Sequence, residues 1–443
     1  MDRYFVRTFG CQMNKHDSER IVGLLEADGM LPAESPEKAD VVVFNTCCVR
    51  ESADERLYGQ VASLKALKTG GRPDVLIAVG GCVGQRDGMR LREQLPHVDV
   101  VFGTHNIESL PALLEAARQG RPSVQVLDRG ETFASDLPSR REHPWHAWVS
   151  ITVGCDNYCS YCIVPYVRGH ERSRPLAAVI AEAENLVADG VVEITLLGQN
   201  VNSYGRDLYG QPRFAEMLRA VASTGIERIR FATSHPKDLS DETIRAMAEI
   251  PQVCNYMHLP VQSGSNRTLT AMNRVYTREH YLDLISKLRF AIPGLAVSTD
   301  VIVGFPGESD EDFADTLDLF KQVGFDQAFT FIYSAREGTP AASLPGRVSK
   351  TVTRERFDQL VEVVQSSAAA ANERIVGTTQ RILLEGCSKR DENMLTGRTD
   401  TNKVVHVPAD SGGTATRKPG TFIDVYIEQA QTWFLLGYPV SDR

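Results

Sequence analysis

Two sets of three cysteines are the residues of this sequence most able to carry out chemistry. The first set lies in the stretch GCDNYCSYCIVPYVRG, where Cys155, Cys159 and Cys162 form a C-x₃-C-x₂-C motif. Three thiolates on one tight loop are one ligand short of what a four-iron cluster or a tetrahedral zinc ion requires. A catalytic cluster needs such an incomplete set, because one iron then stays open to a substrate. A zinc site, with His170 close by in the sequence, is the alternative interpretation.

The second set is spread over the first part of the chain. Cys11, Cys47 and Cys82 are 36 and 35 residues apart, and each directly follows a β-rich run: YFVRTFGC, VVVFNTC and VLIAVGGC. In a parallel sheet such strand ends meet at one edge, where ligands bind. Three unrelated buried cysteines are the alternative. The repeated position at strand ends favours convergence, and therefore a second cluster with an open iron.

Three cysteines remain outside these sets. Cys48 follows Cys47 directly, and neighbouring side chains of an extended strand point to opposite faces. We therefore expect Cys48 to face away from the cluster and to pack in the core. The same packing role is expected for Cys254 and Cys387.

The elements that must position the cysteines form three series. Residues 1–118 alternate strands and amphipathic helices, which predicts a doubly wound parallel sheet with strands near residues 4–8, 41–45, 75–79 and 98–102. Residues 119–146 are polar and predict a linker with at most one strand. Residues 147–373 hold six further strand–helix repeats, which predict a partial (βα)₆ barrel with its site at the carboxyl ends of the strands. Short strands and polar turns over residues 374–443 predict a small antiparallel β-barrel. The fold class is thus α/β with a small all-β domain at the C-terminus.

Composition and charge limit the functional classes. The 443 residues are 42% hydrophobic and 24% charged, as in ordinary globular proteins. A net charge of −9 excludes a chain that is basic throughout. Residues 372–443 hold nine Lys or Arg and nine Asp or Glu, so this segment is neutral and is compatible with binding nucleic acid. No stretch has the pattern of a signal peptide or a membrane span, so we expect a cytoplasmic protein with no membrane association.

The first cysteine motif, placed after the first strand of the barrel, resembles that of the radical S-adenosylmethionine (SAM) enzymes. The resemblance implies that Cys155, Cys159 and Cys162 bind a catalytic [4Fe-4S] cluster whose open iron chelates SAM, which is cleaved to a 5′-deoxyadenosyl radical. It also places Tyr161 beside the adenine. Segments at later strand ends resemble the family's other SAM contacts: Gly198, Gln199 and Asn200 in LLGQN, Ser234 in ATSHP, Gln262 in HLPVQSG, and Ile302 and Gly304 in DVIVGFPGE. Each of these contacts has turn formation as its alternative explanation.

The second cysteine set resembles that of the methylthiotransferases, a radical SAM subfamily, and the match covers nearly the whole chain. FGCQMNKHDSE, FNTCCVRE and GGCVGQR match the N-terminal domain of that subfamily, and the last 70 or so residues are similar to its RNA-binding TRAM domain. The resemblance implies a second [4Fe-4S] cluster on Cys11, Cys47 and Cys82. At this cluster one SAM methylates a sulfur, while a second SAM supplies the radical that activates the substrate.

GQNVNSYG resembles the branch of the subfamily that acts on tRNA. The implied reaction replaces the C2 hydrogen of an N6-isopentenyladenosine beside the anticodon with a methylthio group. The implied partners are tRNA, an electron donor such as flavodoxin or ferredoxin, and a sulfur donor, and the chain is expected to be a monomer. Candidate RNA contacts are Arg168, Lys389, Arg390, Arg398 and Lys403, with Arg172 and Arg174 as further candidates for phosphate or for the SAM carboxylate.

Three other functions are open at this stage. The same chemistry could act on a ribosomal protein aspartate or on threonylcarbamoyl-adenosine in tRNA. A non-catalytic, zinc-bearing RNA-binding protein would use the same cysteines and the same terminal barrel.

Overall fold

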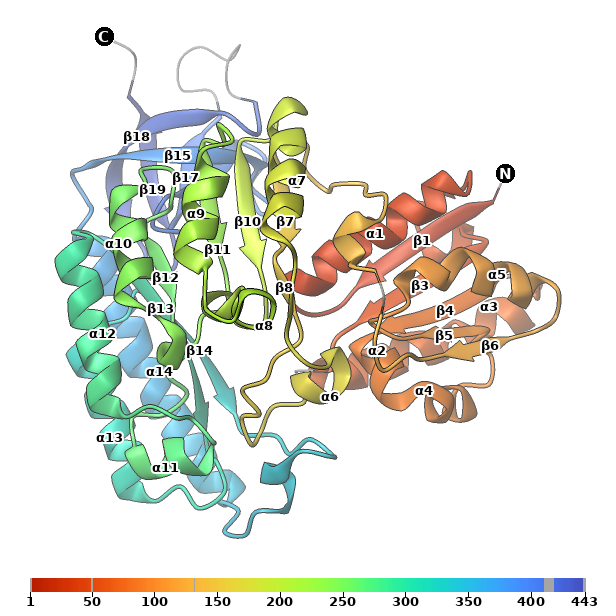
Figure 1. Ribbon diagram of the computed structural model, residues 1–443, viewed down its shortest axis with the longest axis horizontal. Helices are drawn as coiled ribbons and strands as arrows, with labels where there is room; N and C mark the ends of the chain where they lie inside the picture. The colour runs from red at the N-terminus through yellow and green to blue at the C-terminus, as the bar shows by residue number, and fades with distance from the viewer. Residues whose placement is uncertain (1, 49–50, 131, 410–417, 441–443) are drawn as a thin grey trace.

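The computed structural model describes residues 2–48, 51–130, 132–409 and 418–440. Three bodies follow one another along the chain, as Figure 1 shows: an N-terminal α/β domain, a central barrel and a C-terminal β-barrel. The predicted fold class is confirmed. None of the described helices combines the length and the apolar character that crossing a bilayer requires.

The N-terminal domain is a six-stranded sheet with the order β2-β1-β3-β4-β5-β6, in which every pairing is parallel. Helices α1 and α5 pack on one face, and helices α2 and α4 pack on the other, so the sheet is doubly wound. Its elements are β1 (Arg3–Thr8), α1 (Gln12–Ala27), β2 (Leu31–Pro32), β3 (Val41–Thr46), α2 (Glu51–Ser63), α3 (Lys65–Thr69), β4 (Leu76–Gly81), α4 (Cys82–Gln94), β5 (Val100–Phe102), α5 (Leu110–Arg118) and β6 (Ser123–Gln125).

The expected linker is more ordered than its composition indicates. Strand β6 lies inside residues 119–146 and pairs with β5, so the sheet continues past the predicted boundary at residue 118. The following segment packs on α1, where Ser135 lies 3.0 Å from a ring nitrogen of His16. A three-residue edge strand is too short to show an alternating hydrophobic pattern in the sequence. It forms because it pairs with β5.

The central domain has six parallel strands in two three-stranded sheets, with the orders β11-β10-β7 and β12-β13-β14. An isolated parallel bridge between Ile229 and Val253 joins the two sheets, which completes the predicted partial barrel. One large apolar core fills the space between strands and helices. The strands are β7 (His146–Ser150), β10 (Glu193–Leu197), β11 (Arg228–Phe231), β12 (Tyr256–His258), β13 (Ala296–Val303) and β14 (Gln327–Ile332), with the short pair β8 (Thr152–Val153) and β9 (Arg172–Ser173). The helices are α6 (Val164–Arg168), α7 (Leu176–Ala188), α8 (Arg206–Tyr209), α9 (Phe214–Ala222), α10 (Asp241–Glu249), α11 (Asn266–Ala271), α12 (Arg278–Ala291), α13 (Asp310–Val323) and α14 (Lys350–Glu373).

The C-terminal domain is a closed barrel with the strand order β15-β16-β17-β19-β18. Its strands are β15 (Thr379–Cys387), β16 (Met394–Thr399), β17 (Val404–Pro408), β18 (Phe422–Ala430) and β19 (Leu435–Pro439). Cys387 is exposed, so the expectation that it packs in the core is wrong. The register of β15 shifts between Leu384 and Gly386, and Cys387 is the exposed last residue of the strand beyond this bulge.

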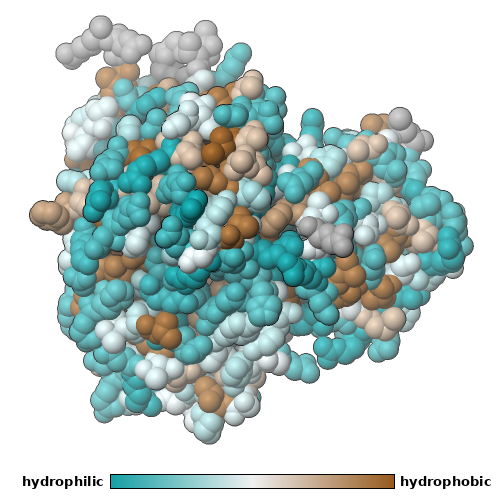
Figure 2. All heavy atoms as spheres, viewed as in Figure 1, coloured by the Kyte–Doolittle hydropathy of each residue, from teal (hydrophilic) through white to brown (hydrophobic). Residues whose placement is uncertain are grey.

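Buried polar contacts connect the three domains. Arg20 of α1 reaches Glu182 of α7 at 2.9 Å, which joins the first two domains. On the other side of the central domain, Arg230 of β11 donates to the carbonyl oxygens of Thr399 and Asp400 at 2.7 and 3.2 Å. The face shown in Figure 2 is largely hydrophilic with scattered apolar residues, and the N-terminal body joins the larger mass at a narrowing.

Candidate functional site

The first cysteine motif forms a loop directly after β8 at the carboxyl end of the barrel strands. Gly154 opens the loop with a φ of 85°, and a Cβ there would lie 2.1 Å from the carbonyl oxygen of His170. The amide of Cys155 donates to the Gly169 carbonyl at 3.1 Å, and the amide of Cys162 donates to the Cys159 carbonyl at 2.9 Å. Two distant segments complete the loop: Ser160 N donates to Met272 O at 3.0 Å, and Ala341 N donates to Ser160 O at 2.8 Å.

The three thiols of this loop lie in a desolvated environment. Burial raises the pKa of Cys155 to about 11, and burial together with the neighbouring Cys159 raises the pKa of Cys162 to about 12. The buried guanidinium of Arg274 donates to the Cys159 sulfur at 3.5 Å. Because metal ligands bind as thiolates, a nearby cation and an iron cluster would each offset the cost of ionising these groups. Sequence reasoning missed Arg274, which follows a short helix rather than a strand and carries no local signal.

The residues predicted to bind SAM lie at the carboxyl ends of consecutive strands, as expected for a barrel site. Gly198, Gln199 and Asn200 follow β10, and Ser234 follows β11. Gln262 follows β12 and has a φ of 68°. Tyr161 and Ile302 both pack against a small apolar cluster formed by Met272, Phe305 and Ala341.

Some of these side chains already have partners in the chain. The Gln199 side chain accepts a hydrogen bond from Gly154 N at 2.6 Å, so it supports the cysteine loop. Asn200 donates to Asp238 at 2.7 Å. The Cβ that Gly304 lacks would lie 2.6 Å from the Thr353 side chain, so close packing against α14 explains this glycine.

Several buried polar atoms at the mouth of the barrel have no hydrogen-bond partner among the described residues. They are Thr152 Oγ1, Asn200 Oδ1, both amide atoms of Asn202, and His235 Nε2. Unpartnered buried polar atoms are costly, and a polar ligand would satisfy them. The residues present therefore fit SAM, whose amino, carboxylate and ribose groups supply both donors and acceptors.

An acidic group that sequence reasoning did not identify lies in the same place. Glu171 accepts a hydrogen bond from Ser203 at 2.7 Å, and burial together with Asp207 and Asp238 raises its pKa to about 7. Asp238 is buried and pairs with Arg206 at 2.8 Å, and Asp207 is exposed, so Glu171 is the half-buried carboxylate that suits a cationic ligand; SAM carries a sulfonium and an ammonium. The only sequence signal was Glu171 itself, nine residues after the last cysteine of the motif.

The second cysteine set converges at the carboxyl edge of the N-terminal sheet. Cys11 precedes α1, Cys82 begins α4, and Cys47 directly follows β3. The Cys47 thiol donates a hydrogen bond to Cys11 and, with the Arg168 guanidinium, lowers the pKa of Cys11 to about 6 although burial opposes this. The Cys48 thiol similarly donates to Cys82 and lowers its pKa.

The expectation that Cys48 faces away is wrong in one respect. Cys48 is fully buried, as predicted for a packing residue, but its thiol touches Cys82. Strand β3 ends at Thr46, so Cys47 and Cys48 lie beyond the strand and the alternation of side chains no longer applies. Four thiols therefore gather at this edge.

The donor chemistry at both triads fits iron–sulfur clusters, which bind cysteine thiolates. Within the part of the chain that the structure describes, no three His, Cys, Asp or Glu side chains already stand at metal-ligand spacing.

Two arginines and one lysine that were predicted to contact ligands instead form ion pairs inside the protein. Arg168 pairs with Asp17 at 2.8 Å, and both side chains are about 5% exposed or less, so the prediction that Arg168 binds RNA is wrong. Arg174 pairs with Glu182 at 2.6 Å in the domain interface. Lys403 pairs with Asp326 at 2.8 Å between the terminal barrel and the central one, so its predicted RNA contact is also wrong. A single sequence does not reveal which basic residues an interface between domains will cover.

The other basic candidates differ in their accessibility. Arg172 lies over the Phe133 ring and donates to the Gly130 carbonyl. Arg398 pairs with Glu385 at 2.9 Å and remains more than one third exposed. Lys389 and Arg390 are exposed on the turn after β15.

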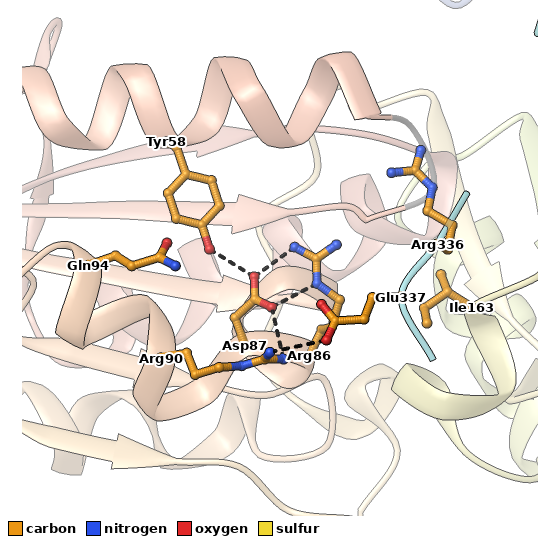
Figure 3. Close-up of a pocket in the computed structure, with 8 residues that line it drawn as sticks. All are labelled: Tyr58, Arg86, Asp87, Arg90, Gln94, Ile163, Arg336 and Glu337. Carbon is orange, nitrogen blue, oxygen red and sulfur yellow. Dashed lines mark hydrogen bonds and ion pairs between the residues drawn. The ribbon is translucent and has the colours of Figure 1, made fainter. Parts of the chain in front are cut away.

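A cleft of about 300 Å³ lies between the N-terminal domain and the central domain (Figure 3). Arg86 and Arg90 of α4 line one side, and Arg336 and Glu337 line the other. Arg90 lies between two carboxylates, 3.8 Å from Asp87 and 3.7 Å from Glu337. The cleft is close to both cysteine sets, because α4 begins at Cys82 and Ile163 in the cleft wall follows Cys162.

Comparison with protein families matches this architecture part by part. The radical SAM superfamily model covers residues 149–320, and the TRAM domain model covers residues 373–440. Residues 3–103 match a model described as an uncharacterized protein family, UPF0004. Solved structures agree on the fold: the radical SAM methyltransferase TsrM from Kitasatospora setae has a TM-score of 0.57 at 15% identity, covering 77% of each chain.

Curated relatives match almost end to end. The tRNA-2-methylthio-N(6)-dimethylallyladenosine synthase of Acidothermus cellulolyticus is 50% identical over 96% of this chain and 86% of its own length. The enzyme of the same name from Moorella thermoacetica is 48% identical over 98% of this chain and 97% of its own length. Taken with the cysteine loop at the mouth of the barrel, these matches show that the chain belongs to the tRNA-2-methylthio-N6-dimethylallyladenosine synthases, a family of radical SAM enzymes that use a [4Fe-4S] cluster and SAM.

Proposed function

We propose that this protein transfers a methylthio group to C2 of N6-isopentenyladenosine next to the anticodon of tRNA, with two iron–sulfur clusters in separate roles. The observation that carries the proposal is the connection between the two cysteine sets. Arg168 lies six residues after Cys162, and its neighbour Val167 packs in the same apolar cluster as Cys48 and Cys82. Six residues of chain span at most about 22 Å, so the two sets lie on adjoining segments, which supports their acting on one substrate base.

Each cysteine set has its own role in the proposal. Cys155, Cys159 and Cys162 hold the radical cluster, and Cys11, Cys47 and Cys82 hold the second cluster. The chemistry supplied by these groups when bound is a radical from SAM at the first set and a methylated sulfur at the second. C2 of adenine has no acidic proton and is a poor electrophile, so a radical route suits the substrate.

The protein's own residues bind and orient the cofactor and the substrate. The unpartnered atoms of Asn200, Asn202 and His235 accept from and donate to SAM, and Tyr161 with Ile302 packs against its adenine. Ser234 and Gln262 lie at neighbouring strand ends and are proposed to contact its ribose and carboxylate. The carboxylate of Glu171 faces the cationic end.

Exposed side chains around the cysteine loop and on the terminal barrel suit RNA. Tyr158 and Tyr166 are exposed, and their ring centroids lie 6.4 Å apart beside the radical-cluster loop. Aromatic rings in such positions stack on unpaired bases, as in an anticodon loop. On the terminal barrel, Lys389, Arg390 and Arg398 are proposed to contact the phosphate backbone.

Further parts of the proposal concern organisation and partners. Residues 1–118 with β6 carry the second cluster, residues 147–373 form the radical SAM core, and residues 374–443 form the TRAM domain. The reaction consumes electrons and sulfur, so an electron donor such as flavodoxin or ferredoxin and a separate sulfur donor are required. We propose a monomer that acts in the cytoplasm.

Cysteine variants and tRNA analysis test the proposal. Cys155→Ala is expected to abolish SAM cleavage, whereas Cys11→Ala is expected to keep SAM cleavage and to lose methylthiolation. Cys387→Ala, an exposed cysteine far from both sets, is the matched control and keeps both activities. Mass spectrometry of tRNA digested from a deletion strain is expected to show loss of 2-methylthio-adenosines. Unchanged tRNA in that strain, or methylthiolation by Cys11→Ala, contradicts the proposal.

A further inference from the structure

Arg168 is a buried cation that one domain places against the cysteines of another. It is the last residue of α6 in the central domain, yet its guanidinium lies at the carboxyl edge of the N-terminal sheet. There it donates to Asp17 Oδ2 at 2.8 Å, and it interacts electrostatically with Cys82 and Cys11. Helix α6 packs against α4, which begins at Cys82, and Val167 shares an apolar cluster with Cys82. The proposed function gives the Arg168 side chain no role of its own.

Of the titratable groups around Arg168, one carboxylate carries a charge that opposes the guanidinium. Asp17 is the acid in direct contact, and it is as deeply buried as the arginine. His16 touches Asp17, and burial keeps the pKa of His16 below its usual value, so this imidazole is neutral near pH 7. His105 lies nearby, and burial followed by the Arg168 charge lowers its pKa to about 4, so it too is neutral.

The helix ends add to the same local field. Cys11 precedes the first turn of α1, and Cys82 is the first residue of α4. The amino ends of both helices are therefore directed at the site, and such ends carry partial positive charge. The guanidinium of Arg168 adds positive charge beside these thiols, and the Asp17 carboxylate opposes it.

We propose that Arg168 is a positioning residue for the second cluster, which raises the reduction potential of that cluster through its buried positive charge beside the start of α4. The inference rests on the proposed function, because it takes the N-terminal cysteines to hold a cluster. A one-electron donor reduces the cluster by one unit of charge, and no bond forms or breaks. A cation beside the thiolates stabilises the reduced, more negative form, whereas the Asp17 carboxylate destabilises it.

This geometry predicts opposite effects from two variants that break the same ion pair. Arg168→Met removes the cation and leaves the carboxylate, so the potential is expected to fall. Asp17→Asn removes the carboxylate and leaves the cation, so the potential is expected to rise. A purely structural role would make the two variants behave alike, because each destroys the contact between α6 and α1.

The measurement uses the full chain with Cys155, Cys159 and Cys162 all changed to Ala, so that only the second cluster is present. After anaerobic reconstitution, the cluster is titrated with dithionite in the presence of mediators and followed by electron paramagnetic resonance. We expect Arg168→Met to change the ratio of oxidised to reduced cluster at a fixed potential by about tenfold or more, which is about 59 mV for a one-electron couple. Arg168→Lys keeps a cation, and its cluster is expected to have a reduction potential between those of Arg168→Met and the wild type.

Arg20→Met is the matched control. Arg20 makes a comparably buried ion pair across the same domain interface, with Glu182 at 2.9 Å. Its loss is expected to lower the melting temperature without moving the potential. A shift of the same size in this variant would attribute the effect to loosened domains and would overturn the proposal.

The remaining outcomes are also decisive. Unchanged potentials, or shifts of the same sign in Arg168→Met and Asp17→Asn, refute the role of Arg168 while leaving the proposed function intact. If Arg168→Met does not retain iron, the test depends on Asp17→Asn alone. An unchanged or lowered reduction potential of the cluster in Asp17→Asn then refutes the inference. Absence of any cluster in the background with three alanines refutes the proposed second cluster itself.

Discussion

Replacement of Arg230 by Met is expected to loosen the terminal β-barrel from the central domain. Arg230 is buried on β11, where it donates to Glu193 at 2.9 Å and to the carbonyl oxygens of Thr399 and Asp400. Burial disfavours ionisation of Glu193, but Arg230, His146 and Arg228 outweigh it and hold the pKa of Glu193 below its usual value. The variant leaves this carboxylate and both carbonyls without their main donor.

The size of the effect follows from these contacts. Glu193 belongs to the same domain as Arg230, so their ion pair persists when the barrel undocks, and the interface loses the two hydrogen bonds from the guanidinium to Thr399 and Asp400. A hydrogen bond to a charged group contributes about 1.5–3 kcal/mol, so we expect the low end for the two together, about 3 kcal/mol. That free energy corresponds to roughly a hundredfold change in the equilibrium between docked and undocked barrel.

Hydrogen exchange is the suitable assay, because one unfolding free energy is not defined for a chain of several domains. Amides of β16 are expected to lose about a hundredfold of their protection, which is the same free energy expressed as an exchange rate. Amides of β13, far from the interface, are expected to keep theirs. Affinity for tRNA is expected to fall, while SAM cleavage without tRNA stays unchanged.

Arg381→Met is the control for Arg230→Met. Arg381 also pairs across this interface, with Glu227 at 3.4 Å, but its side chain is 63% exposed. Exposed pairs contribute about 1 kcal/mol or less, so little protection should be lost. Equal losses in the two variants would show that burial does not set the strength of this interface.

Three further predictions concern the cofactor and the substrate. The pKa of Glu171 is raised to about 7, so its carboxylate is mostly protonated at pH 6 and ionised at pH 8. The affinity for SAM should therefore rise from pH 6 to pH 8 in the wild type and stay constant in Glu171→Gln. If the variant keeps the wild-type pH profile, Glu171 does not contact SAM. Arg390→Gln on the terminal barrel should weaken tRNA binding and reduce the slope of log K against log salt by about one, whereas the exposed Arg354→Gln on α14 should not; equal slopes would remove Arg390 from the RNA contacts. Gly154→Ala should lose the iron of the radical cluster and keep that of the second, because the added Cβ lies 2.1 Å from a carbonyl oxygen; full iron content would contradict the strain argument.

Local patterns were enough to predict the fold and the two cysteine sets. Strand–helix alternation predicted the parallel sheets, and the position of a cysteine after each of three strands predicted that Cys11, Cys47 and Cys82 converge. Both predictions depend on the same physical rule, because parallel strands bring their carboxyl ends to one edge.

The errors concern contacts between distant segments. Arg168 lies on a sequence that reads as a basic surface stretch, and only the packing of α6 against the N-terminal domain shows that it is buried. Arg274 reaches Cys159 from 115 residues away along the chain. Cys48 was assigned to the opposite face because the chain was assumed to stay extended through Cys47 and Cys48, whereas β3 ends at Thr46. A single sequence carries no information on such tertiary contacts.

The radical-cluster loop depends on segments that the ribosome makes much later. Ser160 receives its backbone partners from Met272 and Ala341, so the loop has its final shape only after most of the barrel has been synthesised. The N-terminal cysteines lie on a sheet whose last strand ends at Gln125. The two cysteine sets therefore reach their final geometry at different times during synthesis, with the N-terminal sheet complete first and the cysteine loop of the barrel last.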